Sequence, residues 1–191
     1  MDIKPTDALI VVDVQNDFCP GGALPVVDGD AVVPVINRLL ARTRHPVFTR
    51  DWHPANHCSF SDAPEFVDGS WPAHCVQNTP GAAFHPGLDV PEDARVVDKA
   101  TDPSYEDYDG FQGTTLGDEL RERGVDRVFI CGLATDYCVK NTVLGARREG
   151  FEVVVVEDGC RAIDVPPGTA AQALAEMRRA GATVCESGDI L

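Results

Sequence analysis

The sequence predicts an α/β protein, a doubly wound parallel-sheet sandwich with about six strands and helices on both faces. Short Val- and Ile-rich runs alternate along the chain with segments of helical periodicity, the order that right-handed β-α-β crossovers produce. Most of these runs lack polar alternation, as expected for parallel strands covered on both faces. Hydrophobic residues make up 43% of the 191 residues, so one domain spanning residues 1–191 is expected.

Six segments are expected to form the sheet: Ala8–Val14, Pro46–Thr49, Arg95–Asp98, Arg127–Cys131, Phe151–Val156 and, more weakly, Ala182–Cys185. A first helix is expected over residues 32–40, capped by Asp30 and with Pro34 in its first turn. Further helices are expected at 114–123, 135–148 and 167–180, each followed by a glycine that suits a helix end.

Residues 51–92 interrupt the alternation. This stretch holds six prolines, little periodicity and four of the five histidines. A loop this long inside a compact domain is usually functional, and we expect it to be an excursion that binds a metal.

Composition limits the partners and the compartment. Sixteen Lys and Arg against 31 Asp and Glu give a net charge of −15, which argues against nucleic acid and anionic membranes. No membrane span, signal peptide or CxxC pair is visible, and the seven cysteines form no disulfide framework. We therefore expect a cytoplasmic protein with reduced thiols and a small-molecule substrate; a homo-oligomer is compatible with the sequence.

Chemically active side chains follow four of the expected strands. Asp13, Asp51 and Lys99 end or follow the first three, and Cys138 opens the helix after the fourth. Open α/β sheets place their sites beyond the carboxyl ends of the strands. Two carboxylates, an ammonium and a thiol are therefore expected at one edge of the sheet.

Cys138 is the candidate nucleophile of this group. With Thr135 as the cap, the thiol lies in the first turn of its helix, where unpaired N–H groups and the macrodipole favour thiolate. Lys99 could add positive charge and Asp13 could accept the thiol proton. The alternative is a small buried hydrophobe, the commoner role of a lone cysteine. No histidine lies near these strand ends, so a Cys-His pair is unsupported.

Asp51 and His53 are candidate metal ligands, because alternate side chains of an extended segment face the same way. His57 and His74 follow in the long loop. A carboxylate with two or three imidazoles suits Zn²⁺, and also Fe²⁺ or Mn²⁺. The alternative is a set of hydrogen-bonded loop residues, since the spacing matches no zinc finger.

At these residues the sequence resembles the nicotinamidase/pyrazinamidase branch of the isochorismatase-like cysteine hydrolases. The resemblance rests on ordered motifs within residues 8–145: Asp13–Phe18, Thr49–Pro54, Trp71–Cys75, Lys99, Tyr108–Phe111 and Gly132–Val139. Each motif alone is modest, whereas together and in order they are highly specific.

The resemblance implies a catalytic triad of Asp13, Lys99 and Cys138. It implies one divalent metal held by Asp51, His53 and His74. Zn²⁺ is the ion expected first, and Fe²⁺ or Mn²⁺ is also compatible. The resemblance also implies an oxyanion hole from the backbone N–H groups of Ala134 and Cys138, with a cis peptide before Ala134. The substrate pocket would be lined by Phe18, Leu24, Trp71 and Tyr108, although Leu24 fits ordinary core packing equally well.

Two positions vary within the family. His57 follows His53 by four residues where some members place a ligand six residues on, so His57 is either a further ligand or a hydrogen-bond partner of metal-bound water. Tyr137 stands where some members carry histidine, which would tune the pocket.

The implied reaction converts nicotinamide, and also pyrazinamide, to the acid and ammonia through a cysteine thioester, within NAD salvage. A different enzyme activity that the family resemblance allows is hydrolysis of another small amide or a vinyl ether. The residues are also compatible with a metal-bound hydroxide that attacks without Cys138, or with a binding module that has no activity.

Overall fold

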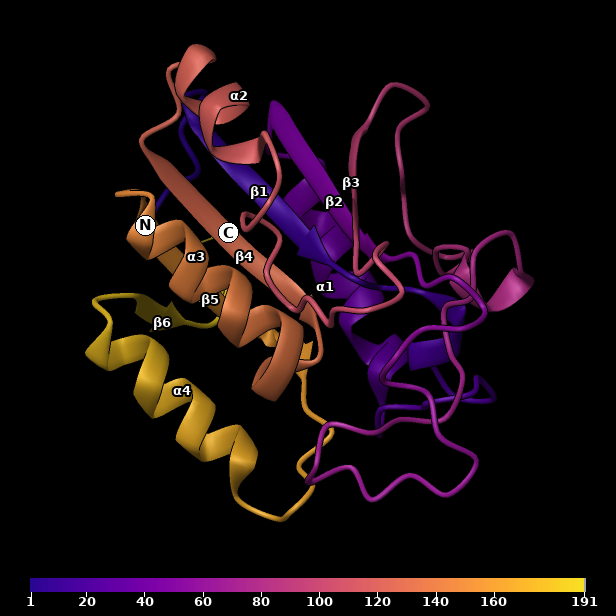
Figure 1. Cartoon of the computed structure of the whole chain (residues 1–191). Coiled ribbons are helices and arrows are strands. Elements are labelled where there is room, and N and C mark those ends of the chain that lie inside the picture. Colours follow the sequence, from indigo (N-terminus) through magenta and orange to yellow (C-terminus); the bar gives the residue numbers. More distant parts are fainter. Residues whose placement is uncertain (191) are drawn as a thin grey trace.

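The computed structural model describes residues 1–190, and its centre is one sheet of six parallel strands in the order β3-β2-β1-β4-β5-β6 (Figure 1). The strands are β1 Asp7–Val12, β2 His45–Asp51, β3 Arg95–Lys99, β4 Arg127–Leu133, β5 Glu152–Arg161 and β6 Thr183–Cys185. This is the doubly wound architecture that the sequence predicts.

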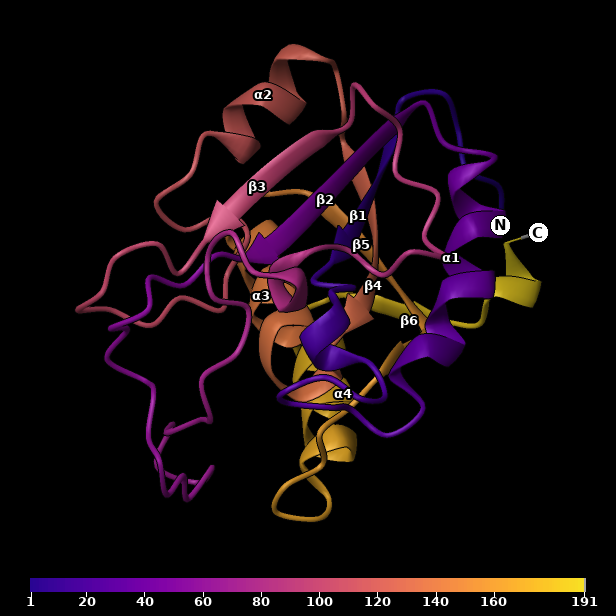
Figure 2. The same cartoon turned by 90° about the vertical axis from the view of Figure 1, so that its right-hand side faces the viewer.

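Helices cover both faces of the sheet unequally. Helix α1 (Val33–Leu40) lies on one face, while α2 (Leu116–Glu122), α3 (Lys140–Arg148) and α4 (Thr169–Arg179) lie on the other (Figures 1 and 2). Short 3-10 turns occur at Asn16–Phe18, Gly29–Val32, Pro80–Ala82 and Ser187–Asp189.

Strand β1 forms the middle of the core. Residues 8–12 are completely buried, because β2 and β4 flank the strand and helices cover its faces. Helix α1 packs Val33, Ile36 and Leu39 inward. Continuous burial explains why the strand sequence shows no polar alternation.

Two expected helix caps were wrong. Asp30 lies in a 3-10 turn and makes no capping bond, since the chain is already helical at Val32 when α1 begins. The expected helix at 135–148 begins instead as a π turn, Thr135–Val139, preceded by the extended residue Ala134. The Val139 N–H bonds the carbonyl of Ala134, five residues back, so Thr135 does not cap this helix.

The connection between β2 and β3 replaces a crossover helix with a long loop. Isolated bridges pair His53 with Val76 and Phe60 with Trp71, and one 3-10 turn interrupts it. The bridges hold the loop's histidines near the carboxyl ends of the strands.

Among residues 1–190, no helix combines the length and the apolar character needed to cross a bilayer.

Candidate functional site

The four predicted side chains meet at the carboxyl edge of four neighbouring strands. Lys99 ends β3, Asp51 ends β2, Asp13 follows β1, and Cys138 lies in the π turn after β4. The strand order reverses between β1 and β4, and in open α/β sheets this switch point is where ligands bind.

Sharp backbone turns deliver these side chains. Asp13 has a left-handed φ of 48°, which turns the chain immediately after β1. Gly132 (φ 124°) lies opposite Val12 in β1, and a Cβ there would come 2.0 Å from the Val12 carbonyl oxygen. A glycine at 132 therefore allows β4 to approach β1 closely. The Leu133–Ala134 peptide is cis, as the resemblance implies.

Lys99 lies at the centre of the polar cluster. Its Nζ is 2.8 Å from Asp13 Oδ2 and 3.3 Å from Cys138 Sγ, and it also bonds Asp51 Oδ1. Thr49 Oγ1 donates to Asp13 Oδ1 at 2.7 Å. All four charged or thiol groups are at least 96% buried, so one ammonium compensates two carboxylates in a low-dielectric interior.

Burial governs the proton affinities of the cluster. It raises the pKa of Asp13 from 3.8 to about 6, although Lys99 acts in the opposite direction. Burial also raises the pKa of the Cys138 thiol well above its usual range, and Lys99 offsets only part of this. Desolvation therefore opposes the thiolate that the helix terminus and Lys99 were expected to favour.

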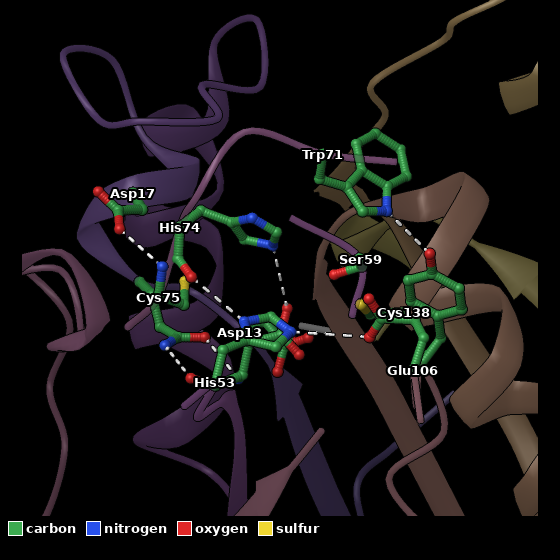
Figure 3. A network of polar contacts seen from close by, with 12 residues as sticks. Asp13, Asp17, His53, Ser59, Trp71, His74, Cys75, Glu106 and Cys138 are labelled. Atoms are coloured by element: carbon green, nitrogen blue, oxygen red, sulfur yellow. Dashed lines mark hydrogen bonds and ion pairs between the residues drawn. The ribbon is translucent and has the colours of Figure 1, made fainter. Parts of the chain in front are cut away.

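Asp51, His53 and His74 bring one ligand atom each within 4.8 Å of one another. His53 Nδ1 lies 3.2 Å from the carbonyl oxygen of His74 (Figure 3). His74 Nδ1 lies 2.8 Å from the carbonyl oxygen of Pro72. Carbonyls only accept, so in the neutral rings both Nδ1 atoms carry the proton and both Nε2 atoms keep a lone pair.

These lone pairs face other acceptors. His53 Nε2 is buried without a hydrogen-bond partner and lies 3.6 Å from Glu106 Oε1. His74 Nε2 lies 3.9 Å from Asp51 Oδ2. Neutral imidazoles leave no proton between these acceptors, and such a set suits a cation. Backbone carbonyls that accept from Nδ1 are a common way to orient metal-binding imidazoles. The donor set therefore fits a divalent metal.

His57 differs from the other two histidines. Its Nε2 lies 3.1 Å from the Tyr105 carbonyl oxygen and its Nδ1 lies 2.8 Å from Ser59 Oγ. One ring nitrogen thus contacts its own loop and the other contacts the segment after β3. Its ring packs 4.4 Å from that of His53, centroid to centroid, so it supports His53 from outside the ligand triangle.

A small aromatic cavity of about 20 Å³ opens beside the thiol. It is lined by Phe18, Leu24, Asp51, Trp71, His74, Tyr108, Ala134, Tyr137, Cys138 and Ile163, so the structure brings all four predicted pocket residues together. Trp71 Nε1 donates to the Tyr108 hydroxyl at 2.9 Å (Figure 3). A larger hollow of about 390 Å³ beside Asn16 and His85 contains none of the candidate catalytic residues or metal ligands, so cavity size alone does not locate the chemistry.

Sequence reasoning missed Glu106 and Ile163. Glu106 lies in the loop after β3 and faces His53, and Ile163 lines the pocket from the segment after β5. Neither belongs to a recognisable motif. Only the clustering of acids around Tyr108 offered a signal for Glu106, and nothing marked Ile163.

Two motif acids instead hold loops in place. Asp17 Oδ2 accepts the Cys75 N–H at 2.7 Å, which ties the pocket loop to the segment carrying His74 (Figure 3). Asp109, beside Tyr108, bonds Arg148 of α3 at 2.6 Å. Asp17 and Asp109, which belong to the motifs but not to the triad or the metal ligands, therefore have a structural role.

Known proteins are similar to this chain over almost its whole length. The isochorismatase domain family matches residues 7–189. A nicotinamidase from Escherichia coli (strain K12) is 44% identical, over 97% of each chain. A pyrazinamidase of Pyrococcus horikoshii, solved in complex with zinc, is 48% identical with a TM-score of 0.85, over 95% of this chain and 99% of that one. A protein from L. infantum, solved in complex with nicotinate, is 37% identical with a TM-score of 0.90. The match covers 100% of this chain and 98% of that one.

Proposed function

This chain belongs to the isochorismatase family, and from that premise we propose that it is a nicotinamidase that hydrolyses nicotinamide to nicotinate and ammonia within NAD salvage. The observation that carries the proposal is the buried contact of Cys138 Sγ with Lys99 Nζ, itself paired with Asp13. Such a set can activate a thiol against a carbonyl. The similar proteins named nicotinamidase and pyrazinamidase support an aromatic amide as substrate.

The first step is attack of Cys138 Sγ on the carboxamide carbon. Because burial keeps the resting thiol protonated, the proton passes to Asp13 as the sulfur–carbon bond forms. Lys99 stays an ammonium, since Asp13 and Asp51 outweigh burial and raise its pKa well above the usual range. The ammonium therefore compensates negative charge and does not act as the base.

The oxyanion of the tetrahedral intermediate is assigned to the N–H groups of Ala134 and Cys138. Losing one such donor typically costs about 10²–10³ in rate. Asp13 then returns its proton to the departing amine, ammonia leaves, and a thioester remains. Water attacks the thioester, Asp13 takes a proton from that water, and the sulfur leaves and is reprotonated.

Asp51, His53 and His74 are assigned as ligands of one divalent metal, with Zn²⁺ preferred because the similar P. horikoshii protein was solved with zinc. When bound, this ion supplies a Lewis-acid anchor for the ring nitrogen of the substrate. Phe18, Leu24, Trp71 and Tyr108 then enclose the ring, which places the carboxamide against Cys138. His57 and Glu106 support the ligand set.

Ammonia release from three amides tests the proposal. Nicotinamide and pyrazinamide should be hydrolysed, whereas benzamide, which lacks the ring nitrogen, should have a kcat/KM lower by roughly 10². Chelation should lower nicotinamide turnover toward the benzamide level, while iodoacetamide still alkylates Cys138. Added Zn²⁺, Fe²⁺ and Mn²⁺ then identify the ion that restores activity.

Cys138→Ala should lower kcat by roughly 10⁴ or more, and Cys58→Ala, at an exposed free thiol, is the matched control. Retained turnover in Cys138→Ala would exclude the thioester route. Equal rates for benzamide and nicotinamide, unaffected by chelation, would exclude the nicotinamidase assignment.

A further inference from the structure

Asp136 is a buried motif acid that the proposed chemistry does not use. It lies in the π turn two residues before Cys138, and it is 4% exposed. Its carboxylate accepts three hydrogen bonds, two from the segment that joins β5 to α4 and one from Thr169, the first residue of α4. Oδ1 accepts the Ile163 N–H at 3.1 Å, and Oδ2 accepts the Asp164 N–H at 2.9 Å and the Thr169 hydroxyl at 2.7 Å.

The segment held in this way is one wall of the aromatic cavity. Ile163 lines the cavity together with Cys138 and Tyr137. The middle of the segment is exposed, with Val165 at 38%. Another hydrogen bond between this segment and the nucleophile turn is the long one of 3.4 Å from the Tyr137 hydroxyl to the Val165 carbonyl. The three bonds to Asp136 are shorter, so this carboxylate is the principal tie between the two walls.

The position of this wall decides what fits beside the thiol. A cavity of about 20 Å³ is only slightly larger than the roughly 10–15 Å³ that a single water molecule needs. A small displacement of Ile163 is therefore large relative to the cavity. Hydrogen bonds to a charged acceptor are among the stronger ones in proteins, which makes a buried carboxylate suited to setting this position.

We propose that Asp136 is a positioning residue that sets the pocket wall at Ile163 and thereby the affinity for small aromatic amides, an inference that rests on the proposed function. Asp136 acts through Ile163 and does not touch the reacting atoms. Its loss should release the wall, weaken the contacts with the substrate ring and uncover the thiol.

A double-mutant cycle tests this coupling. Asp136→Asn keeps the size of the side chain but replaces one acceptor with a donor that faces the N–H and hydroxyl groups. We expect KM for nicotinamide to rise about tenfold, with kcat within about threefold of wild type. Ile163→Ala should raise KM by a similar factor. In the double variant, the increase in KM should be much smaller than the product of the two single increases.

Alkylation provides a readout that needs no turnover. The Cys138 thiol is 4% exposed behind the wall, so iodoacetamide should react about threefold or more faster in Asp136→Asn than in wild type, consistent with loss of one charge-assisted bond. A defect in the nucleophile turn itself would instead slow alkylation and lower kcat.

Asp158→Asn is the matched control. Asp158 also holds a loop through one backbone N–H and one hydroxyl, both of Ser187. Ser187 does not line the aromatic cavity, whereas Ile163, which Asp136 holds, does. This variant should leave KM and alkylation unchanged. Thr169→Val, which removes only the hydroxyl donor, should shift KM in the same direction as Asp136→Asn by a smaller factor, and it serves if Asp136→Asn does not fold.

Unchanged KM and alkylation in Asp136→Asn, multiplicative effects in the cycle, or a fall in kcat with unchanged KM would each overturn the inference. Failure of the proposed function has a different signature, because wild-type protein would then release no ammonia from nicotinamide. The alkylation comparison still decides the role of Asp136 in that case.

Discussion

At the scale of single residues, the site depends on one ammonium that two carboxylates and a thiol share. Lys99 contacts Asp13, Asp51 and Cys138 in the buried interior. Desolvation raises the pKa values of Asp13 and Cys138, and the ammonium opposes both shifts. A carboxylate with a pKa of about 6 is suited to general base catalysis near neutral pH, because it is ionised there yet can still accept a proton.

The pH dependence of kcat/KM checks this base. Asp13 must be ionised to accept the thiol proton, and burial raises its pKa from 3.8 to about 6. Activity should therefore be low below pH 6 and rise as the pH increases through this value. An acid limb near pH 4 would instead contradict the raised pKa of Asp13. Asp13→Asn should lower kcat by about 10²–10⁴, with Thr49→Val as a milder control that removes one hydrogen bond to the carboxylate.

At the scale of elements, the site depends on how closely β4 approaches β1. Val12 and Gly132 are register partners at the edge where Asp13 and the π turn begin. The glycine combines a left-handed φ of 124° with a position where a side chain would meet the neighbouring backbone. Two separate constraints, the packing of β4 against β1 and the positive φ, thus restrict Gly132. This residue lies next to the turn that carries the nucleophile.

Gly132→Ala should destabilise the fold by about 3 kcal/mol, because backbone strain and overpacking add. Urea unfolding measures this change. Gly113→Ala is the control, since its φ is also positive (68°) but no atom lies within 4 Å of the added Cβ; it should cost about 1 kcal/mol. Equal losses of stability in the two variants would show that strand contact at Gly132 is unimportant.

At the scale of the whole molecule, a net charge of −15 surrounds a site with a neutral substrate and an anionic product. Nicotinamide carries no net charge at neutral pH, so the long-range field neither attracts nor repels it. Nicotinate carries a carboxylate, and the field opposes its return to the site. Salt screens such interactions over about 10 Å at 0.1 M.

Product inhibition should therefore depend on ionic strength. Raising NaCl from about 10 mM to about 500 mM should lower the Ki of nicotinate roughly twofold or more, because repulsion is screened. The KM of nicotinamide should change less. Initial rates at several nicotinate concentrations give both constants, and NaCl and KCl should act alike. A Ki that rises with salt would show that local positive charge at Lys99 and the metal dominates.

The sequence predicted most of the fold and the centre of the site, for reasons visible in particular residues. Buried strands are continuous apolar runs, and parallel strands align their carboxyl ends, so Asp13, Asp51, Lys99 and Cys138 could be placed at one edge before any contact was known. Helix caps were less predictable. Asp30 and Thr135 are good capping residues, yet the local backbone gives them other roles.

What the sequence by itself determined is the order of the strands along the chain and the identity of the reactive side chains, because both depend on local patterns and motifs. Only the tertiary structure decided which residues support them. Glu106 faces His53 across 53 positions of sequence, and Asp136 bonds a segment that begins 27 positions later. The pKa values of Asp13 and Cys138 depend equally on burial by distant segments. Desolvation and contact between loops are properties of packing, so no local pattern encodes them.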